Sequence, residues 1–199
     1  MPCVSSKRHT RQKSGSKGWM DRYKVIRKLA EQHNFQTGAE LGVWVGVTTF
    51  HLMKHTDIKL IYAVDCWEEQ PDNQEYDWQY NKKPKWSKGN MFIPWDHSLN
   101  EKKFREQAVP YADRLQIIKG RSLDVVDKIP DNSLDFVFHD SDHSHPFVLN
   151  EINAYRCKLK QGGFHIGDDI NWDPVKKSVD EAFGKDYIVT GKGVWYKQI

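Results

Sequence analysis

The sequence predicts an α/β fold in which helices cover both faces of a mostly parallel sheet. Short apolar runs of strand length, such as residues 59–64 and 134–138, alternate with segments of helical spacing, such as residues 19–34. This alternation is typical of β-α-β units, whose strands run parallel and whose crossovers are right-handed. The chain has 199 residues, enough for one domain with its own hydrophobic core.

The order of the elements follows from the same patterns. Strands are expected at residues 38–43, 59–64, 115–119, 134–138 and 164–166, with a closing hairpin of residues 187–189 and 194–196. Helices are expected at residues 19–34, 47–55, 98–110, 122–129 and 146–159, and from residue 173 onward. Ser98 and Ser122 are predicted N-caps, Pro146 is predicted in a first turn, and Gly162 and Gly163 are predicted to end a helical unit. The predicted architecture is a Rossmann-like three-layer sandwich with a mostly parallel seven-stranded sheet and a C-terminal antiparallel hairpin.

Two segments depart from this pattern. Residues 1–18 are polar and basic, which predicts a flexible tail, although such a tail could also touch nucleic acid or a membrane surface. Residues 67–97 combine many charges with many aromatic side chains, and long loops of this kind are usually functional. We therefore expect a single domain over residues 19–199, with an insertion at about residues 67–97 that folds over a ligand.

The composition is that of a soluble globular protein, with 38% hydrophobic and 29% charged residues and a net charge of only +3. No apolar run approaches the roughly 18 residues that span a bilayer, and no secretory signal is expected in the basic first residues. Cys3, Cys66 and Cys157 show no metal-type spacing. Reduced thiols and a cytoplasmic location are therefore expected.

A glycine turn follows the first predicted strand, in the run Glu40-Leu41-Gly42-Val43-Trp44-Val45-Gly46. Ligands of parallel sheets bind outside the carboxyl ends of the strands, and glycines at such a turn let the backbone approach a ligand closely. Trp44 stands where the dinucleotide fingerprint has its middle glycine, and no Walker-type lysine follows. The turn therefore differs from both common nucleotide-binding loops.

Two acidic residues accompany this turn. Asp65 ends the next strand, 23 residues after Gly42, where a carboxylate can accept hydrogen bonds from a ribose diol. The alternative is an ordinary strand-end carboxylate in solvent. Glu40 would be costly to leave unpaired at the edge of the core, so a cationic ligand group beside it is expected.

Three further carboxylates, of Asp140, Asp168 and Asp169, follow two strands that the fold makes neighbours. Oxygen ligands of this kind suit a hard divalent cation such as Mg²⁺, and clustered carboxylates repel one another without a cation. The pattern favours a metal site. The alternative is that Asp168 and Asp169 form only a loop turn while Asp140 lies in solvent.

In this order, the runs AELGVWVGVTT, IYAVDCW, KGRS, FVFHDSDHS and GGFHIGDDINW resemble the class I S-adenosylmethionine-dependent methyltransferases. Within that class they are most similar to the metal-dependent small-molecule O-methyltransferases, including the catechol, caffeoyl-coenzyme A and macrocin types. The run DSDHSHPFVLNEINAY also resembles the cephalosporin-hydroxylase-like branch. The resemblance extends from about Gly38 to Trp172, and it is poor in the insertion and at both ends.

The resemblance implies roles for individual residues in binding S-adenosylmethionine. Those residues are Glu40 at the methionine amine, Gly42 and Trp44 at the methionine chain, Asp65 at the ribose and Ser122 at the adenine edge, with Gly46 and Asp140 also in the cofactor site. The metal, Mg²⁺ or another hard divalent cation, would be held by Asp140, Asp168 and Asp169. The family often has Asn at the position of Asp169.

The implied reaction is an in-line attack of a substrate hydroxyl on the cofactor's methyl group, with the cation lowering the pKa of that hydroxyl. His143 follows Asp140 by three residues. This position resembles the one at which the catechol and caffeoyl-coenzyme A types carry a catalytic lysine. A histidine can act as a base at neutral pH. Asp142 and His145 are alternatives, and His143 could instead lie at a helix entry or support the metal.

Other functions remain open. Nucleic-acid methylation is disfavoured because the loop after the fourth strand lacks an Asn/Asp-Pro-Pro-aromatic run and the net charge is modest. A non-catalytic module could use the aromatic insertion to bind a partner, and hydroxylase-accessory chemistry is a further alternative. The expected substrate is a hydroxylated small molecule, such as a sugar, a phenol or a natural product, with no membrane partner. The oligomeric state is left open.

Overall fold

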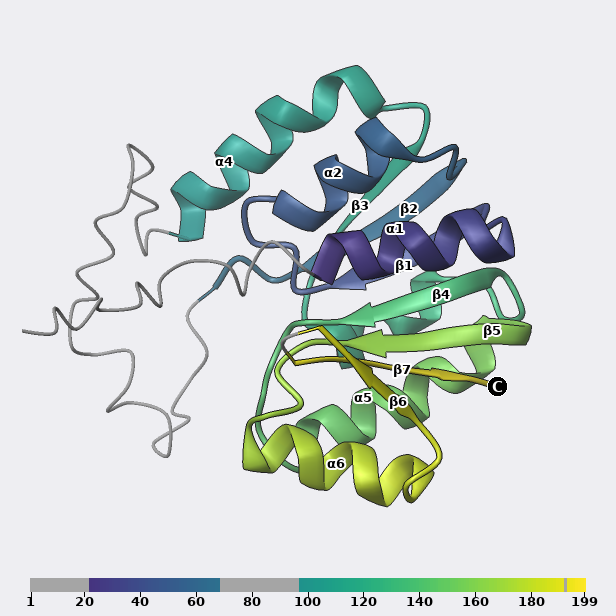
Figure 1. Ribbon diagram of the computed structural model, residues 1–199. Coiled ribbons are helices and arrows are strands. Elements are labelled where there is room, and N and C mark those ends of the chain that lie inside the picture. The colour runs from purple at the N-terminus through teal and green to yellow at the C-terminus, as the bar shows by residue number, and fades with distance from the viewer. Residues whose placement is uncertain (1–21, 69–96, 192) are drawn as a thin grey trace, which may run out of the picture.

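A seven-stranded sheet forms the centre of the computed structural model, which describes residues 22–68, 97–191 and 193–199 (Figure 1). The strands are β1 Thr37–Leu41, β2 Leu60–Asp65, β3 Leu115–Lys119, β4 Leu134–His139, β5 Leu159–Gly167, β6 Ile188–Thr190 and β7 Val194–Gln198. Their order in the sheet is β3-β2-β1-β4-β5-β7-β6. The strands β1 to β5 are parallel, and β7 pairs antiparallel with both β5 and β6. The predicted fold class is confirmed.

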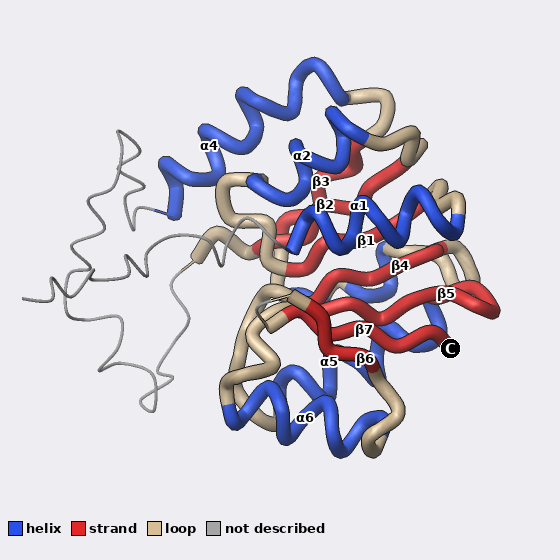
Figure 2. The backbone as a smooth tube through the Cα atoms, viewed as in Figure 1, coloured by secondary structure: helices blue, strands red, loops and turns tan. Residues whose placement is uncertain are grey.

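Helices cover both faces of this sheet, as Figure 2 shows. The helices are α1 Arg22–His33, α2 Val47–His55, α4 His97–Ala108, α5 Phe147–Tyr155 and α6 Asp173–Phe183. The connections between helices and strands in the described residues also contain four 3₁₀ turns, namely η1 Val109–Tyr111, η2 Ser122–Asp124, η3 Val126–Lys128 and η4 Arg156–Lys158. The first three helices pack on one face, whereas α5 and the turns η2 and η3 pack on the other, where α6 lies against α5. The result is the predicted three-layer sandwich.

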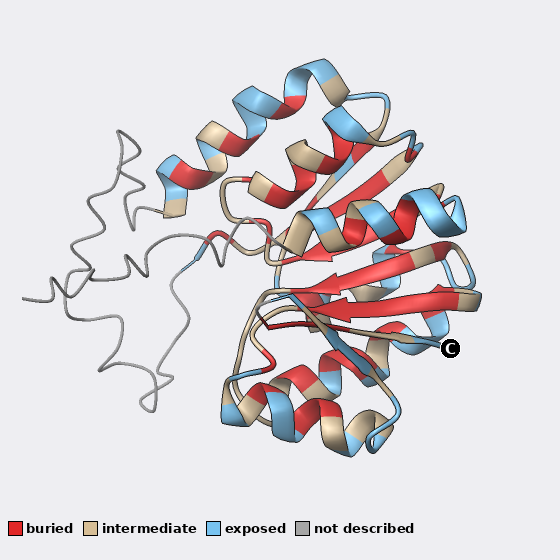
Figure 3. Cartoon of the chain, in the orientation of Figure 1, coloured by how far each residue is buried: buried red, intermediate tan, exposed pale blue. Residues whose placement is uncertain are grey.

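The two faces have separate apolar cores because side chains alternate along each strand. On one face, Ile26 of α1 and Phe104 of α4 pack in the same cluster as Phe138 of β4. On the other face, Tyr155 of α5 packs in the same cluster as Val137 of β4. The central strands are therefore buried on both sides, as Figure 3 shows. This explains why their sequences are continuous apolar runs rather than alternating ones.

Two of the predicted helix starts are wrong. Ser98 lies inside α4, which begins at His97. Ser122 makes no capping hydrogen bond, and its segment forms the turns η2 and η3 rather than one helix. A segment of eight residues is too short to be a stable helix by itself. Burial of Val125 and Ile129 in the core fixes the path of the chain there instead.

Two of the predicted boundaries after the fourth strand are also wrong. Pro146 is the N-cap residue of α5 and not part of its first turn. Gly162 and Gly163 lie within β5, which already begins at Leu159. Gly162 has a φ of 79°, and the pairing of β5 with β4 shifts register nearby. The glycines therefore allow an irregularity inside a long strand instead of ending a helical unit.

Some predictions concern segments that lie wholly or partly outside the described residues. The predicted tail, residues 1–18, and nearly all of the predicted insertion belong to the parts that are not described. In the described part of the chain, no helix is long and apolar enough to cross a membrane. Cys66 is half-buried and Cys157 is exposed, and the described residues contain no disulfide.

Candidate active site

The carboxyl ends of the parallel strands β1, β4 and β5 meet at one edge of the sheet. The pairing of Leu41 with His139, and of His139 with Gly167, aligns the ends of β1, β4 and β5. The backbone N–H of Asp140 donates to the carbonyl of Leu41 at 2.9 Å. The loops after these strands therefore begin side by side, which is the arrangement on which the sequence-based site depends.

The glycine turn after β1 adopts the conformation that glycine favours. Gly42, Trp44 and Gly46 have φ values of 87°, 52° and 82°. A Cβ atom on Gly42 would lie 2.1 Å from the backbone carbonyl oxygen of Asp140. Gly42 is therefore required because the β1 and β4 loops touch, a reason that the sequence alone does not reveal.

Glu40 is buried on β1, directly before this turn, with an exposed fraction of 2%. Its Oε2 accepts a hydrogen bond of 2.5 Å from the hydroxyl of Thr49 on α2. Burial raises the pKa of Glu40 to about 8, although this hydrogen bond and the charge of Arg22 oppose the rise. Glu40 is thus protonated near neutral pH, and a cationic ligand group beside it would favour its ionised form.

Asp65 holds the turn after β1 against the end of β2. Its two carboxylate oxygens accept backbone hydrogen bonds from Trp44 and Trp67, each of 2.7 Å. The indole N–H of Trp67 donates in turn to the carbonyl of Trp44 at 2.8 Å. Burial raises the pKa of Asp65 despite these bonds. Each carboxylate oxygen can accept a further hydrogen bond, so Asp65 can still bind a diol.

Ser122 lies beyond β3, at the edge to which the adenine was assigned. Its residue is buried, and its Oγ has no hydrogen-bond partner among the described residues. The carbonyl of Ser122 accepts a hydrogen bond of 2.9 Å from the hydroxyl of Tyr155, which fixes the backbone there. A buried hydroxyl without a partner is costly, so Ser122 suits a polar ligand edge.

An arginine that the sequence did not single out lies among the predicted metal ligands. The Nη1 of Arg22, at the start of α1, lies 2.8 Å from Asp140 Oδ2 and 3.1 Å from Asp168 Oδ2. The Arg22 side chain is only 12% exposed. Burial lowers the pKa of Arg22, but Asp140 and Asp168 outweigh it and raise the pKa overall. A single arginine on an amphipathic helix gives no sequence signal for such a role.

A second cationic side chain lies beside the same carboxylates. The Nε2 of His143 lies 3.1 Å from Asp169 Oδ2 and 3.7 Å from Asp140 Oδ1. One donor atom from each of these three residues lies within 4.8 Å of the other two. Two carboxylate oxygens and one imidazole nitrogen are a donor set that divalent metals accept. Asp168 is not part of this trio.

The three predicted bases occupy different surroundings. Burial lowers the pKa of His143, but hydrogen bonds and charges from Asp140 and Asp169 raise it to about 10, so His143 is protonated at neutral pH. Asp142 Oδ1 accepts the backbone N–H of Ser144 at 2.6 Å, within the same loop. His145 contacts α6 instead, with its Nδ1 lying 3.0 Å from Ser178 Oγ.

A buried polar network that the sequence analysis did not predict lies behind Asp140. Glu151 of α5 is 1% exposed, and its Oε2 lies 2.8 Å from His139 Nδ1. Its Oε1 accepts a hydrogen bond of 2.6 Å from Ser141 Oγ. The Nε2 of His139 lies 3.0 Å from the Nδ1 of His165. Glu151 therefore holds both chain neighbours of Asp140 and fixes the start of the β4 loop.

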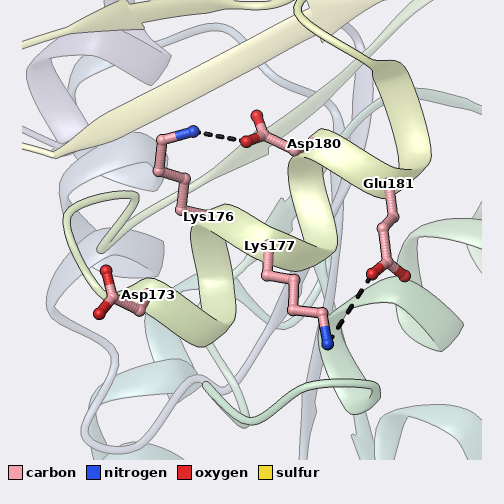
Figure 4. Close-up of a pocket in the computed structure, with 5 residues that line it drawn as sticks. All are labelled: Asp173, Lys176, Lys177, Asp180 and Glu181. Atoms are coloured by element: carbon pink, nitrogen blue, oxygen red, sulfur yellow. Dashed lines mark hydrogen bonds and ion pairs between the residues drawn. The ribbon is translucent and has the colours of Figure 1, made fainter.

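A surface hollow over α6 is separate from this edge. Asp173, Lys176, Lys177, Asp180 and Glu181 line it (Figure 4). Lys176 pairs with Asp180 at 2.5 Å, and Lys177 pairs with Glu181 at 4.0 Å. These are ordinary pairs four residues apart on one helix, and none of the predicted site residues lines the hollow.

The glycine turn, the acidic strand ends and the sheet order together define an α/β methyltransferase. Residues 39–170 match the family of methyltransferase domains, so the chain belongs to this family. Its fold is the class I fold of S-adenosylmethionine-dependent methyltransferases, as the resemblance implied. No curated protein matches the chain in sequence.

Solved structures share this fold at low sequence identity. A Staphylococcus aureus protein described as a caffeoyl-CoA O-methyltransferase is 16% identical, with a TM-score of 0.61, and the match covers 88% of this chain and 81% of that chain. An O-methyltransferase from Bacillus cereus in complex with S-adenosylhomocysteine is 15% identical, with a TM-score of 0.55 and coverage of 88% and 80%. A methyltransferase from Podospora anserina with bound S-adenosylhomocysteine is 13% identical, with a TM-score of 0.57 and coverage of 87% and 76%.

The raised pKa of Glu40 predicts a specific pH dependence of stability. The folded protein retains the Glu40 proton up to about pH 8, whereas the unfolded chain releases it near pH 4.5. Stability from this group is therefore complete below pH 4.5 and is lost as the pH rises to 8, by at most about 5 kcal/mol at 1.36 kcal/mol per pKa unit. Urea unfolding of the wild type and of Glu40→Gln across this range measures the difference. Parallel stability curves for the two proteins would contradict it.

The network behind Asp140 predicts a large effect on stability. Glu151→Ala leaves the buried His139 and the half-buried Ser141 without their shared acceptor, so the free energy of unfolding should fall by about 3–5 kcal/mol. Glu31→Ala is the matched control, because its ion pair with Arg27 is exposed and should contribute less than about 1 kcal/mol. Urea unfolding at pH 7 measures both. Equal losses in the two variants would show that the network does not stabilise the β4 loop.

Proposed function

We propose that this enzyme transfers the methyl group of S-adenosylmethionine to a hydroxyl oxygen of a small molecule, assisted by a divalent cation. The observation that carries the proposal is the donor trio of Asp140, His143 and Asp169, whose ligand atoms lie within 4.8 Å of one another. This trio lies at the carboxyl edge of the sheet, next to the glycine turn through Gly42. An electrophilic methyl group and an activated hydroxyl would meet there.

The cofactor half of the site is formed by β1, β2 and the turn after β3. Glu40 accepts hydrogen bonds from the methionine ammonium group, and the positive charge of this ammonium holds Glu40 in its ionised form. The backbone of Gly42, Trp44 and Gly46 lies along the methionine chain, where left-handed conformations permit close approach. Asp65 binds the ribose diol.

Two groups complete the cofactor half. Ser122 uses its buried hydroxyl at the adenine edge, where it has no partner among the described residues. Asp140 stands at the junction of the two halves, because its backbone touches Gly42 while its carboxylate faces the metal donors. Asp140 therefore orients the reacting oxygen relative to the cofactor.

The metal half would be held by Asp140, His143 and Asp169. A divalent cation bound there would lower the pKa of a coordinated hydroxyl and orient it, as Mg²⁺ does with substrate oxygens. Asp168, the third carboxylate of the sequence-based assignment, makes an ion pair with Arg22 at 3.1 Å instead. The other oxygen of Asp168 accepts the backbone N–H of Asp169 at 2.9 Å, so both of its oxygens are engaged, which supports His143 as the third donor.

The identity of the base follows from this assignment. His143 is surrounded by carboxylates that keep it protonated without metal, so it is poorly suited to accept the hydroxyl proton. A cation bound at the trio would displace the His143 proton, because only neutral imidazole coordinates a metal. Asp142, in the same loop, is then the remaining carboxylate that can accept the hydroxyl proton. His145 is removed from the role by its contact with Ser178 of α6.

Two observations support a small-molecule substrate. Two of the structures that share the fold are described as O-methyltransferases, one of them of the caffeoyl-CoA type. The net charge of +3 gives little attraction to a nucleic-acid backbone. We therefore propose a sugar, phenol or related hydroxylated compound as the substrate, and a cytoplasmic location.

Calorimetric titration with S-adenosylmethionine tests the cofactor half. The wild type should bind S-adenosylmethionine but not NAD or ATP, because the turn lacks the features of either nucleotide loop. Asp65→Ala should weaken binding by about tenfold or more, since it removes a charged acceptor from the ribose. Asp127→Ala, beyond the site on η3, is the control and should leave the affinity unchanged. Equal affinity of the wild type and Asp65→Ala would contradict the ribose assignment.

Metal removal tests the other half. Transfer of a radiolabelled methyl group to a panel of phenols and sugars should be abolished by EDTA and restored by Mg²⁺. Asp169→Ala removes the ligand oxygen and should lower kcat about 10- to 100-fold without weakening S-adenosylmethionine binding. The control is Asp173→Ala, an exposed carboxylate on α6. Activity that persists after complete chelation would exclude the metal role.

A further inference from the structure

Arg22 connects α1 to the acidic edge of the sheet. Its Nη1 contacts Asp140 Oδ2 at 2.8 Å and Asp168 Oδ2 at 3.1 Å, across 146 residues of chain in the second case. The three side chains are between 10% and 12% exposed. A guanidinium held by two carboxylates in a largely buried place is a fixed part of the site, because separating it would leave buried charges unpaired.

The two carboxylates that Arg22 contacts differ in whether their second oxygen can still bind a metal. Asp140 uses Oδ2 for Arg22, while its Oδ1 lies toward His143 at 3.7 Å. Asp168 uses Oδ2 for Arg22, and its Oδ1 accepts the backbone N–H of Asp169 at 2.9 Å. Asp140 therefore still presents an oxygen to the metal donors, whereas both oxygens of Asp168 are already engaged.

We propose that Arg22 is a built-in cation of this site whose ion pair keeps Asp168 from binding a metal. Divalent metal binding then depends on Asp140, His143 and Asp169 but not on Asp168. This inference rests on the proposed function, because it concerns the metal of that site. It divides the acidic edge into two neighbouring cation places that share Asp140. One place is filled by the guanidinium, and a metal can enter the other when it displaces the proton of His143.

The charges explain why the two places can coexist. Four carboxyl groups, those of Glu40, Asp140, Asp168 and Asp169, lie at this edge. Burial raises the pKa of Glu40 and of Asp168, and the charge of Asp140 raises both further. Arg22 balances part of this charge even without metal. A divalent ion at the trio then meets a site that is already partly neutralised, which predicts a weaker metal affinity than all the carboxylates together would produce.

The experiment compares two adjacent residues of the same type. Metal-free protein is titrated with Mn²⁺, and free Mn²⁺ is measured by electron paramagnetic resonance in the wild type, Asp168→Asn and Asp169→Asn. Asp169→Asn should weaken Mn²⁺ binding at least about tenfold. Asp168→Asn should change it by no more than about threefold, because its amide oxygen can still accept from Arg22.

A double-mutant cycle tests the role of Arg22 itself. Arg22→Gln should tighten Mn²⁺ binding, because it frees Asp168 and removes a neighbouring positive charge. In the Arg22→Gln background, Asp168→Asn should then weaken Mn²⁺ binding, although it does not in the wild type. Arg22→Lys retains the charge and should bind Mn²⁺ nearly as the wild type does. S-adenosylmethionine binding and thermal unfolding verify that each variant is folded.

The outcomes separate this inference from the proposed function. Equal losses in Asp168→Asn and Asp169→Asn would overturn the role of Arg22 while retaining a metal site of three carboxylates. Additive effects in the cycle would also overturn it. Wild-type protein that binds S-adenosylmethionine but no Mn²⁺ would contradict the metal part of the proposed function and this inference with it. Mn²⁺ binding only in Arg22→Gln would show that arginine and metal exclude each other, which contradicts two coexisting places.

Discussion

The contact between the loops after β1 and β4 is the constraint on which the site depends. Gly42 and the carbonyl of Asp140 are so close that no side chain fits between them. This contact exists because β1 and β4 are adjacent parallel strands whose ends are in register at Leu41 and His139. It places the glycine turn, where we propose that the cofactor binds, directly beside Asp140, the first carboxylate of the proposed metal site. A methyl donor and a hydroxyl acceptor need such proximity to react.

The same geometry concentrates negative charge, and the surrounding structure has to compensate for it. Burial leaves Glu40 protonated near neutral pH, and the pKa of Asp168 is also raised by burial and by its acidic neighbours. Arg22 and His143 provide the positive charges against these groups. From behind, Glu151 holds His139 and Ser141 through short contacts, so the loop carries its charges on a fixed backbone. The site is therefore preorganised, which is the condition for effective electrostatic stabilisation.

Much of the fold was predictable because its signals are local. The apolar runs of β2 and β4 and the spacing of α2 depend on neighbouring residues, and the predicted bounds of α2 match the structure. The predictions failed where packing decides the outcome. The segment from Ser122 to Ile129 has the polar start of a helix but forms 3₁₀ turns, because its apolar residues pack against the sheet. Gly162 was predicted to end a helical unit but lies within β5.

The sequence by itself determined the order of strands and helices, the glycine turn at Gly42 and the presence of acids at successive strand ends. These features follow from periodicity and from the rule that parallel strands end at a common edge. Only the tertiary structure decided which charges meet. Arg22 pairs with Asp168 and Glu151 reaches His139 because distant elements pack together. His143 joins Asp140 and Asp169 for the same reason. Such contacts depend on the distances and the burial of side chains in the folded chain, and local sequence patterns do not predict these quantities.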